Sequence, residues 1–150
     1  MRVLLPARKL KKYGFQSRIF YKKVPSSTKS DFLILSKLFD KNALESAKRL
    51  KKENNTKVIL DICDNKFSSS KSNDVSCIAN ESNIKKILDH VDCVTVPTNE
   101  LKKIFLNNFH YPKDKIFIVD DFIDVPQKFI QLLHPSFFLS NLVFLIFKLR

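Results

Sequence analysis

The chain has 150 residues, of which 44% are hydrophobic and 28% charged, and its formal net charge is +12 at pH 7. This length suits one domain, and 14 phenylalanines supply more apolar material than a disordered chain carries. A single glycine argues against the glycine-rich phosphate loops of dinucleotide-dependent oxidoreductases and NTPases. Three cysteines without C-x-x-C spacing indicate neither a disulfide framework nor a zinc site, and they fit a reducing, cytoplasmic environment.

The first half of the chain alternates between strand and helix patterns. A strand is predicted at residues 2–5, and a basic stretch containing Gly14 separates it from a second strand at residues 31–35. A helix follows and ends at Asn54 and Asn55; its apolar stripe consists of Ala43, Leu44, Ala47 and Leu50. A strand at residues 57–62 and a serine-rich loop at residues 67–80 come next.

The alternation continues in the second half. A helix is predicted around residues 84–91 with Asn80 or Ser82 as its N-cap, followed by a strand at residues 93–96. A helix capped by Thr98, a strand at residues 116–119 and a helical segment from Asp124 complete the series. Such alternation predicts right-handed crossovers and an α/β fold with a doubly wound, mainly parallel, Rossmann-like sheet in a single domain.

The pattern fails near the C-terminus. We therefore divide the chain into a Rossmann-like domain at residues 1–134 and an apolar C-terminal tail at residues 135–150. Residues 142–147 are apolar on every side, which predicts a buried or partner-covered helix, with abnormal tail sequence as the alternative. This run is far shorter than the roughly 20 residues that a membrane-spanning helix needs.

Positive charge is concentrated at the N-terminus. The first 30 residues hold nine lysines and arginines, and the first acidic residue is Asp31. Such a segment attracts anions, and the candidates are nucleic acid, an anionic membrane surface, or the phosphates of a lipid-linked or nucleotide-linked substrate. A general lysine bias of the sequence explains the same charge without any ligand.

Polar side chains follow three of the predicted strands. Asp61, Asp64 and Asn65 lie at and just past the end of the strand at residues 57–62. Thr98, Asn99 and Glu100 follow the strand at residues 93–96, and Asp120 and Asp121 follow the strand at residues 116–119. Buried parallel strands gather their polar groups at their carboxyl ends, where ligands of open α/β sheets bind. Turn formation by Asp64 and helix capping by Thr98 are the structural alternatives. No metal site is predicted, because no third carboxylate or histidine stands near the paired acids.

Four segments, taken together and in order, resemble the N-terminal half of group 1 glycosyltransferases of the GT-B fold. They are DFLILSK at residues 31–37, VILDICDN at residues 58–65, VTVPTNEL at residues 94–101 and IFIVDDFID at residues 116–124. In that family a strand with an Asp-x-x-Asp tail, a V-x-V-P/S-T-x-x-L junction and a V-I-x-D/N-x-I-D link recur in this order. The resemblance covers residues 31–126.

The resemblance implies the acceptor side of an enzyme that transfers a sugar from a nucleotide-sugar donor to a sugar or lipid-linked acceptor. It implies no further cofactor and identifies no catalytic residue. It places substrate contacts at Gly14, Ser17 and Arg18, after the first strand, and at Asp64, Asn65, Thr98, Asn99 and Glu100, on the rim of the cleft.

Three expectations about partners follow. The chain ends shortly after the family's interdomain link, so turnover is expected to need a separate donor-domain chain. The basic segment is expected to meet an anionic acceptor or the inner face of a membrane as a peripheral contact. The rival hypothesis is a non-catalytic basic module that binds nucleic acid or anionic lipid, and a third is a truncated, inactive remnant.

Overall fold

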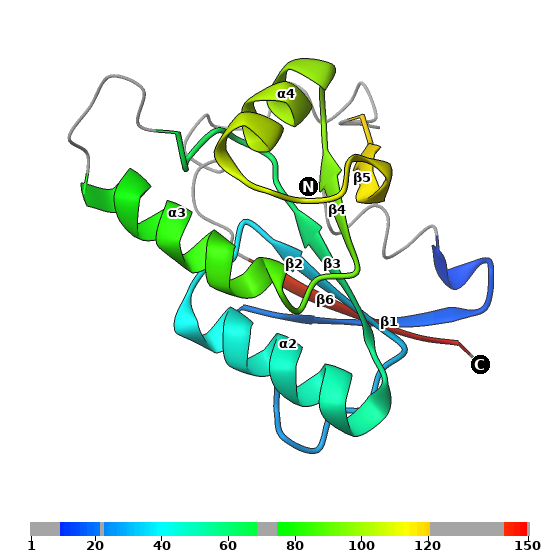
Figure 1. The fold of residues 1–150 in the computed structure, drawn as a ribbon. Coiled ribbons are helices and arrows are strands. Elements are labelled where there is room, and N and C mark those ends of the chain that lie inside the picture. The colour runs from blue at the N-terminus through cyan, green and yellow to red at the C-terminus, as the bar shows by residue number, and fades with distance from the viewer. Residues whose placement is uncertain (1–9, 22, 69–74, 121–142, 150) are drawn as a thin grey trace, which may run out of the picture.

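The computed structural model describes residues 10–21, 23–68, 75–120 and 143–149 (Figure 1). Four strands pair in parallel in their chain order: β2 (Phe32–Ser36), β3 (Lys57–Asp61), β4 (Cys93–Val96) and β5 (Ile116–Ile118). With β1 (Phe15–Phe20) and β6 (Val143–Leu149) they form one sheet of order β1-β6-β2-β3-β4-β5. The predicted α/β class with a mainly parallel, Rossmann-like sheet is thereby confirmed.

Three helices connect the parallel strands. They are α2 (Lys41–Asn54), α3 (Val75–Leu88) and α4 (Asn99–Asn108), and a short 3-10 turn, η1 (Lys113–Lys115), leads into β5. Right-handed crossovers that advance in one direction place their helices on one face of a sheet, and Figure 1 shows α2 and α3 side by side in front of the strands. The predicted strand at residues 2–5 and the helical segment from Asp124 lie outside the described residues.

The main core lies between these helices and one face of the sheet. Alternate strand residues point into it, and Leu33, Leu35, Val58, Leu60, Val94 and Val96 are all fully buried. The ring of Phe67, in the loop after β3, packs on those of Phe105 and Phe109 with centroids 5.9 and 5.1 Å away. The loop that carries Asp64 is therefore anchored to α4 by aromatic packing.

Two of the three helices begin and end at residues that the sequence marks. Asp40 accepts a hydrogen bond from the Ala43 N–H at 2.8 Å, and α2 ends at Asn55, which adopts a left-handed conformation with φ 54°. Thr98 caps α4, because its hydroxyl accepts a hydrogen bond from the Leu101 N–H at 3.1 Å. The structural explanation of Thr98 is thus confirmed.

The start of α3 differs from the prediction. The helix begins at Val75, so residues 75–80 are helical rather than part of the predicted loop, and neither Asn80 nor Ser82 is an N-cap. Asn80 instead donates its side-chain amide to the Lys66 carbonyl at 3.0 Å. This tertiary contact is unrelated to the local capping preferences of asparagine and serine, so the prediction from capping residues placed the start too late.

The C-terminal apolar run is a strand and not the predicted helix. β6 pairs antiparallel with β1 on one side and with β2 on the other. A short apolar run fits either a buried helix or a buried strand, and valine, isoleucine and phenylalanine favour the strand. Residues 143–149 of the predicted tail therefore belong to the sheet, while the proposed boundary at residue 134 lies outside the described residues.

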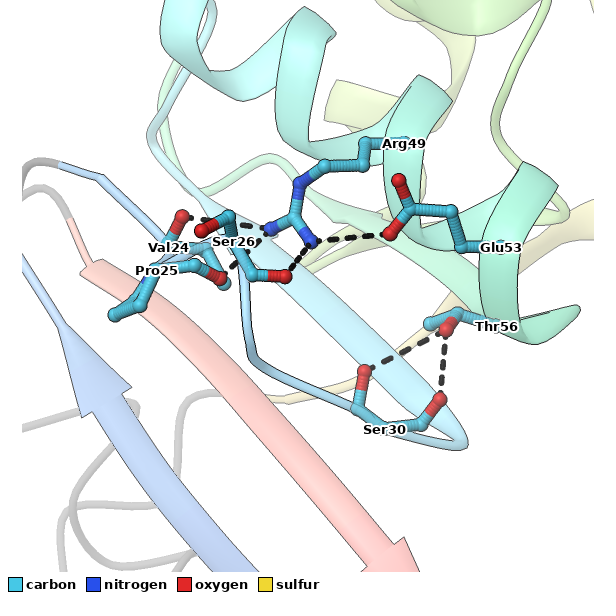
Figure 2. A network of polar contacts seen from close by, with 7 residues as sticks. All are labelled: Val24, Pro25, Ser26, Ser30, Arg49, Glu53 and Thr56. Atoms are coloured by element: carbon cyan, nitrogen blue, oxygen red, sulfur yellow. Dashed lines mark hydrogen bonds and ion pairs between the residues drawn. The ribbon is translucent and has the colours of Figure 1, made fainter.

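Arg49 of α2 holds the loop that precedes β2 (Figure 2). Its guanidinium donates hydrogen bonds to the carbonyls of Val24, Pro25 and Ser26 at 3.4, 3.0 and 2.8 Å. It also pairs with Glu53, one turn further along the helix, at 3.4 Å. Both terminal nitrogens of the guanidinium are thus engaged, and the planar donor fork fixes the loop against the flank of α2.

At the amino ends of the parallel strands, Asp92 connects β3, β4 and α2. One carboxylate oxygen accepts a hydrogen bond from the Val58 N–H at 2.8 Å, and the other lies 3.0 Å from Lys51 Nζ. Burial alone would raise the pKa of Asp92, but the Val58 N–H and the Lys51 ammonium outweigh it and hold the pKa below its ordinary value of 3.8. The charged form is therefore stabilised by folding.

Asp92→Ala is expected to lower the free energy of unfolding by about 1–3 kcal/mol, because the N–H of buried Val58 loses its acceptor. Asp92→Asn keeps an oxygen there and should cost less. Since the folded-state pKa is lowered, the stability gained from the charge is present above pH 3.8 and is lost as the pH falls through the lowered value. Urea unfolding should show the difference between wild type and Asp92→Asn shrinking from pH 7 to about pH 3; a widening difference would contradict this assignment.

Candidate functional site

A layer of polar side chains crosses the carboxyl ends of three neighbouring strands. Ser36, Asp61 and Thr95 occupy directly paired positions on β2, β3 and β4. The two hydroxyls donate to opposite oxygens of the Asp61 carboxylate, each at 2.8 Å, and the Cys63 thiol donates to it at 3.4 Å. Asp61 is only 7% exposed. A buried carboxylate needs such donors, so this layer fixes the strand ends rigidly.

These side chains lie on the face of the sheet opposite the main core. Leu35, Leu60 and Val94, each one position before the polar residue of its strand, point into that core, and strand side chains alternate between faces. The same opposite face carries a smaller apolar cluster that includes Phe15, Ile19, Phe32 and Ile34. The Asp61 layer is therefore the polar end of a largely apolar surface.

The rim of this edge carries charged groups that remain open to solvent. Lys37 Nζ lies 3.2 Å from one oxygen of Asp64, and Lys66 Nζ lies 3.7 Å from the other. The side chains of Lys37 and Asp64 are 37% and 38% exposed. Half-exposed ion pairs contribute little to stability, so both groups can exchange this contact for a ligand at low cost.

The backbone at this rim is also unusual. Lys37 adopts a left-handed conformation with φ 57°, which is disfavoured for a residue with a Cβ atom. Its N–H donates to the Asp61 carbonyl at 3.2 Å, so the turn that carries the Lys37 side chain is tied to the end of β3. Strained backbone of this kind is concentrated at binding and catalytic sites, which makes Lys37 a candidate site residue.

Most of the predicted rim residues lie at this carboxyl edge. Asn65 follows Asp64, and its side-chain oxygen accepts a hydrogen bond from the Ser68 N–H at 3.1 Å, which forms a turn. Thr98, Asn99 and Glu100 follow the next strand at the start of α4, and all three are exposed. Asp120 is exposed just after β5, whereas Asp121 lies outside the described residues.

The other three predicted contacts lie elsewhere. Gly14 immediately precedes β1, and Ser17 and Arg18 are within it rather than in a loop. β6 pairs Ser17 with Phe147 and Phe147 with Phe32, so Ser17 is level with the first residue of β2, at the amino end of the parallel strands. The expectation that these residues approach the same cleft as Asp64 is therefore wrong in its placement. The physical reason is that these residues form a strand of the sheet rather than a loop: β1 pairs with β6, and β6 separates β1 from β2.

Sequence reasoning missed Ser36, Lys37, Cys63 and Thr95 as members of the site. The signal was present for Thr95, because a single polar residue interrupts the apolar strand Cys93–Val96. Its meaning depends on the strand register, which places Thr95 beside Asp61 and Asp61 beside Ser36. No local pattern reports that register.

Two other titratable groups make poor candidates for chemistry at neutral pH. Burial and the neighbouring charge of Asp92 raise the pKa of the Cys93 thiol, which disfavours the thiolate. Burial likewise raises the pKa of Tyr111 to about 12, and the Tyr111 hydroxyl donates to the Val91 carbonyl at 3.1 Å. Both groups serve the packing around β4.

Comparisons with protein-family models, curated proteins and solved structures found no match. The class of protein is accordingly defined by its own architecture, a Rossmann-like α/β domain. Within the described residues, no group of three histidine, cysteine, aspartate or glutamate side chains is arranged to hold a metal ion. None of the helices in the described part of the chain has the length and apolar character needed to cross a bilayer.

Proposed function

We propose that the chain is the acceptor-side domain of a sugar-transferring enzyme and that its carboxyl edge binds the acceptor. The observation that carries this proposal is the position of the four segments that resemble group 1 glycosyltransferases. They occupy β2, β3, β4 and β5 in order. The polar residues of these segments lie at one edge of the parallel sheet, where the strands end. That edge is where ligands of open α/β sheets bind.

The chemistry of the rim supports an acceptor with hydroxyl groups. Ionised Asp64 offers only acceptor oxygens, whereas Lys37 and Lys66 offer only donors. Neighbouring hydroxyls of a sugar both donate and accept, so they can pair with both kinds of group. The Asp61 layer beneath holds the strand ends in place, and fixed orientation of an acceptor hydroxyl is a large part of the acceleration in group transfer.

Contacts to the donor nucleotide belong, in this proposal, to a separate donor-domain chain. Equilibrium dialysis of the full chain against methyl glycosides and against UDP-glucose tests the division of roles. Binding of a glycoside without binding of UDP-glucose, and no sugar transfer or hydrolysis by the chain alone, is the expected result. Preference for the nucleotide sugar, or robust turnover by the isolated chain, would contradict the proposal.

A second candidate function is binding of single-stranded nucleic acid by the basic N-terminal region. Tyr13 and Tyr21, on either side of β1, are 76% and 57% exposed, and the exposed basic side chains of Lys11, Lys12, Arg18 and Lys23 stand among them. Exposed aromatic rings beside basic groups stack on bases while the cations meet phosphates. This function predicts oligonucleotide affinity that falls steeply as salt rises from 50 to 200 mM, with no response to glycosides.

A further inference from the structure

A pocket of about 300 Å³ lies between α2 and the loop that precedes β2, and no residue of the carboxyl-edge site lines it. Its lining residues are Lys23, Val24 and Ser26 from the loop, and Asn42, Glu45, Ser46 and Arg49 from the helix. This volume is at the lower end of the range for small-molecule sites. Six of the seven lining residues have polar or charged side chains.

Ser46 is the residue that distinguishes this pocket. It belongs to the buried stripe of α2 together with Ala43, Ala47 and Leu50, and it is only 5% exposed. Within the described part of the chain, no hydrogen bond to the Ser46 hydroxyl is found, and Ser46 is one of the residues that line the pocket. An unpaired buried hydroxyl is costly, and alanine would fill the stripe equally well. A ligand in the pocket would supply the missing partner.

The walls of the pocket are held in place before any ligand arrives. Arg49 binds the carbonyls of Val24, Pro25 and Ser26, so the loop wall is tied to the helix wall (Figure 2). The positive charge of Arg49 is matched by Glu53. The lining also carries Lys23 and Glu45, which have opposite signs, and Glu45 pairs with Lys41 at 3.8 Å. An ion of either sign would therefore meet one opposing group as well as one matching group.

We propose that this pocket binds a neutral polyhydroxy compound of about monosaccharide size. Each hydroxyl of such a compound both donates and accepts, so it can pair with the Ser46 hydroxyl, the Asn42 amide and the Glu45 carboxylate. The inference concerns a site separate from the carboxyl edge, and it holds whether or not the chain takes part in sugar transfer.

The test is a titration of the ¹⁵N-labelled full chain with glucose, galactose and myo-inositol, and with glycine as a zwitterion of similar net charge. At least one of the three polyols is expected to shift the amide signals of Asn42, Glu45 and Ser46 saturably, and glycine is not. Ser46→Ala should weaken that binding by between about threefold and tenfold, the effect of one lost hydrogen bond. Ser82→Ala, on the exposed face of α3, is the matched control and should leave the affinity unchanged.

A second measurement, the thermal stability of the variants without ligand, tests the proposal independently of which polyol is chosen. Removing an unpaired buried hydroxyl should make Ser46→Ala thermally more stable than Ser82→Ala, by about 2–4 °C, since both variants gain the same helix propensity. A Ser46→Ala variant less stable than the control would show that the hydroxyl already has a partner and would overturn the proposal. So would the absence of polyol shifts at Asn42, Glu45 and Ser46, a response to glycine instead, or an affinity that Ser46→Ala leaves intact. Shifts confined to Asp64 and Thr98 would support the proposed function while refuting this pocket.

Discussion

Deletion of residues 143–149 is expected to abolish cooperative folding of the chain. β6 lies inside the sheet, and its removal takes away the strand pairing of β1 and one of the two pairings of β2. The backbone groups of β1 and β2 that lose their hydrogen-bond partners should cost more than about 5 kcal/mol, which is comparable to the whole stability of many domains. Far-UV circular dichroism and urea unfolding of the truncated chain measure this loss directly.

A synthetic peptide of residues 143–149 provides the matched rescue. Added in excess, it should restore the unfolding transition, because an extended peptide can pair with the two strand edges that the deletion leaves open. A peptide of scrambled sequence should restore nothing. If the truncated chain unfolds at the same urea concentration as the full chain, the placement of β6 between β1 and β2 is wrong.

Asp61→Ala is expected to lower the free energy of unfolding by about 2–5 kcal/mol. The substitution leaves the hydroxyls of Ser36 and Thr95 without their shared acceptor in a buried layer, and it creates a small cavity there. Asp61→Asn, which retains one oxygen acceptor, should lose less. Urea unfolding at pH 7 gives both values.

The matched control for this site is Asp89→Ala, which removes an exposed aspartate near the end of α3 and should change stability by less than about 0.5 kcal/mol. A similar small effect for Asp61→Ala would mean that the hydroxyl–carboxylate layer does not form. The carboxyl edge would then lack the rigid base that the proposed acceptor site requires.

The parallel half of the fold was predictable because its local signals agree with its tertiary role. The apolar strands around Leu33, Leu60 and Val94 and the helical stripe through Ala43 and Leu50 each face the core that they form. The two predictions that failed, for the C-terminal strand and for the start of α3, concern elements that depend on distant contacts. β6 is specified by its two neighbouring strands, and the first turns of α3 depend on contacts such as the one between Asn80 and Lys66.

The candidate site shows the same division. The polar ends of the strands predicted that Asp64 and Thr98 lie at one edge of the sheet, and the parallel arrangement brings both residues to the carboxyl edge. The composition of the site was less predictable, since Ser36 and Thr95 join Asp61 only through the register of three strands. Gly14 and Arg18 were misplaced because the strand β1 was not recognised within the basic N-terminal stretch.

The claim that the carboxyl edge is an acceptor-binding site is tested most directly by a residue-resolved map of glycoside binding. In a titration of the ¹⁵N-labelled full chain with methyl glycosides, saturable shifts are expected at Lys37, Asp64 and Thr98. Asp64→Ala should weaken the affinity by about tenfold, whereas Asp89→Ala, which removes an exposed carboxylate near the end of α3, should not. Shifts that gather at the amino end of the strands, or an affinity that Asp64→Ala leaves unchanged, would contradict the account.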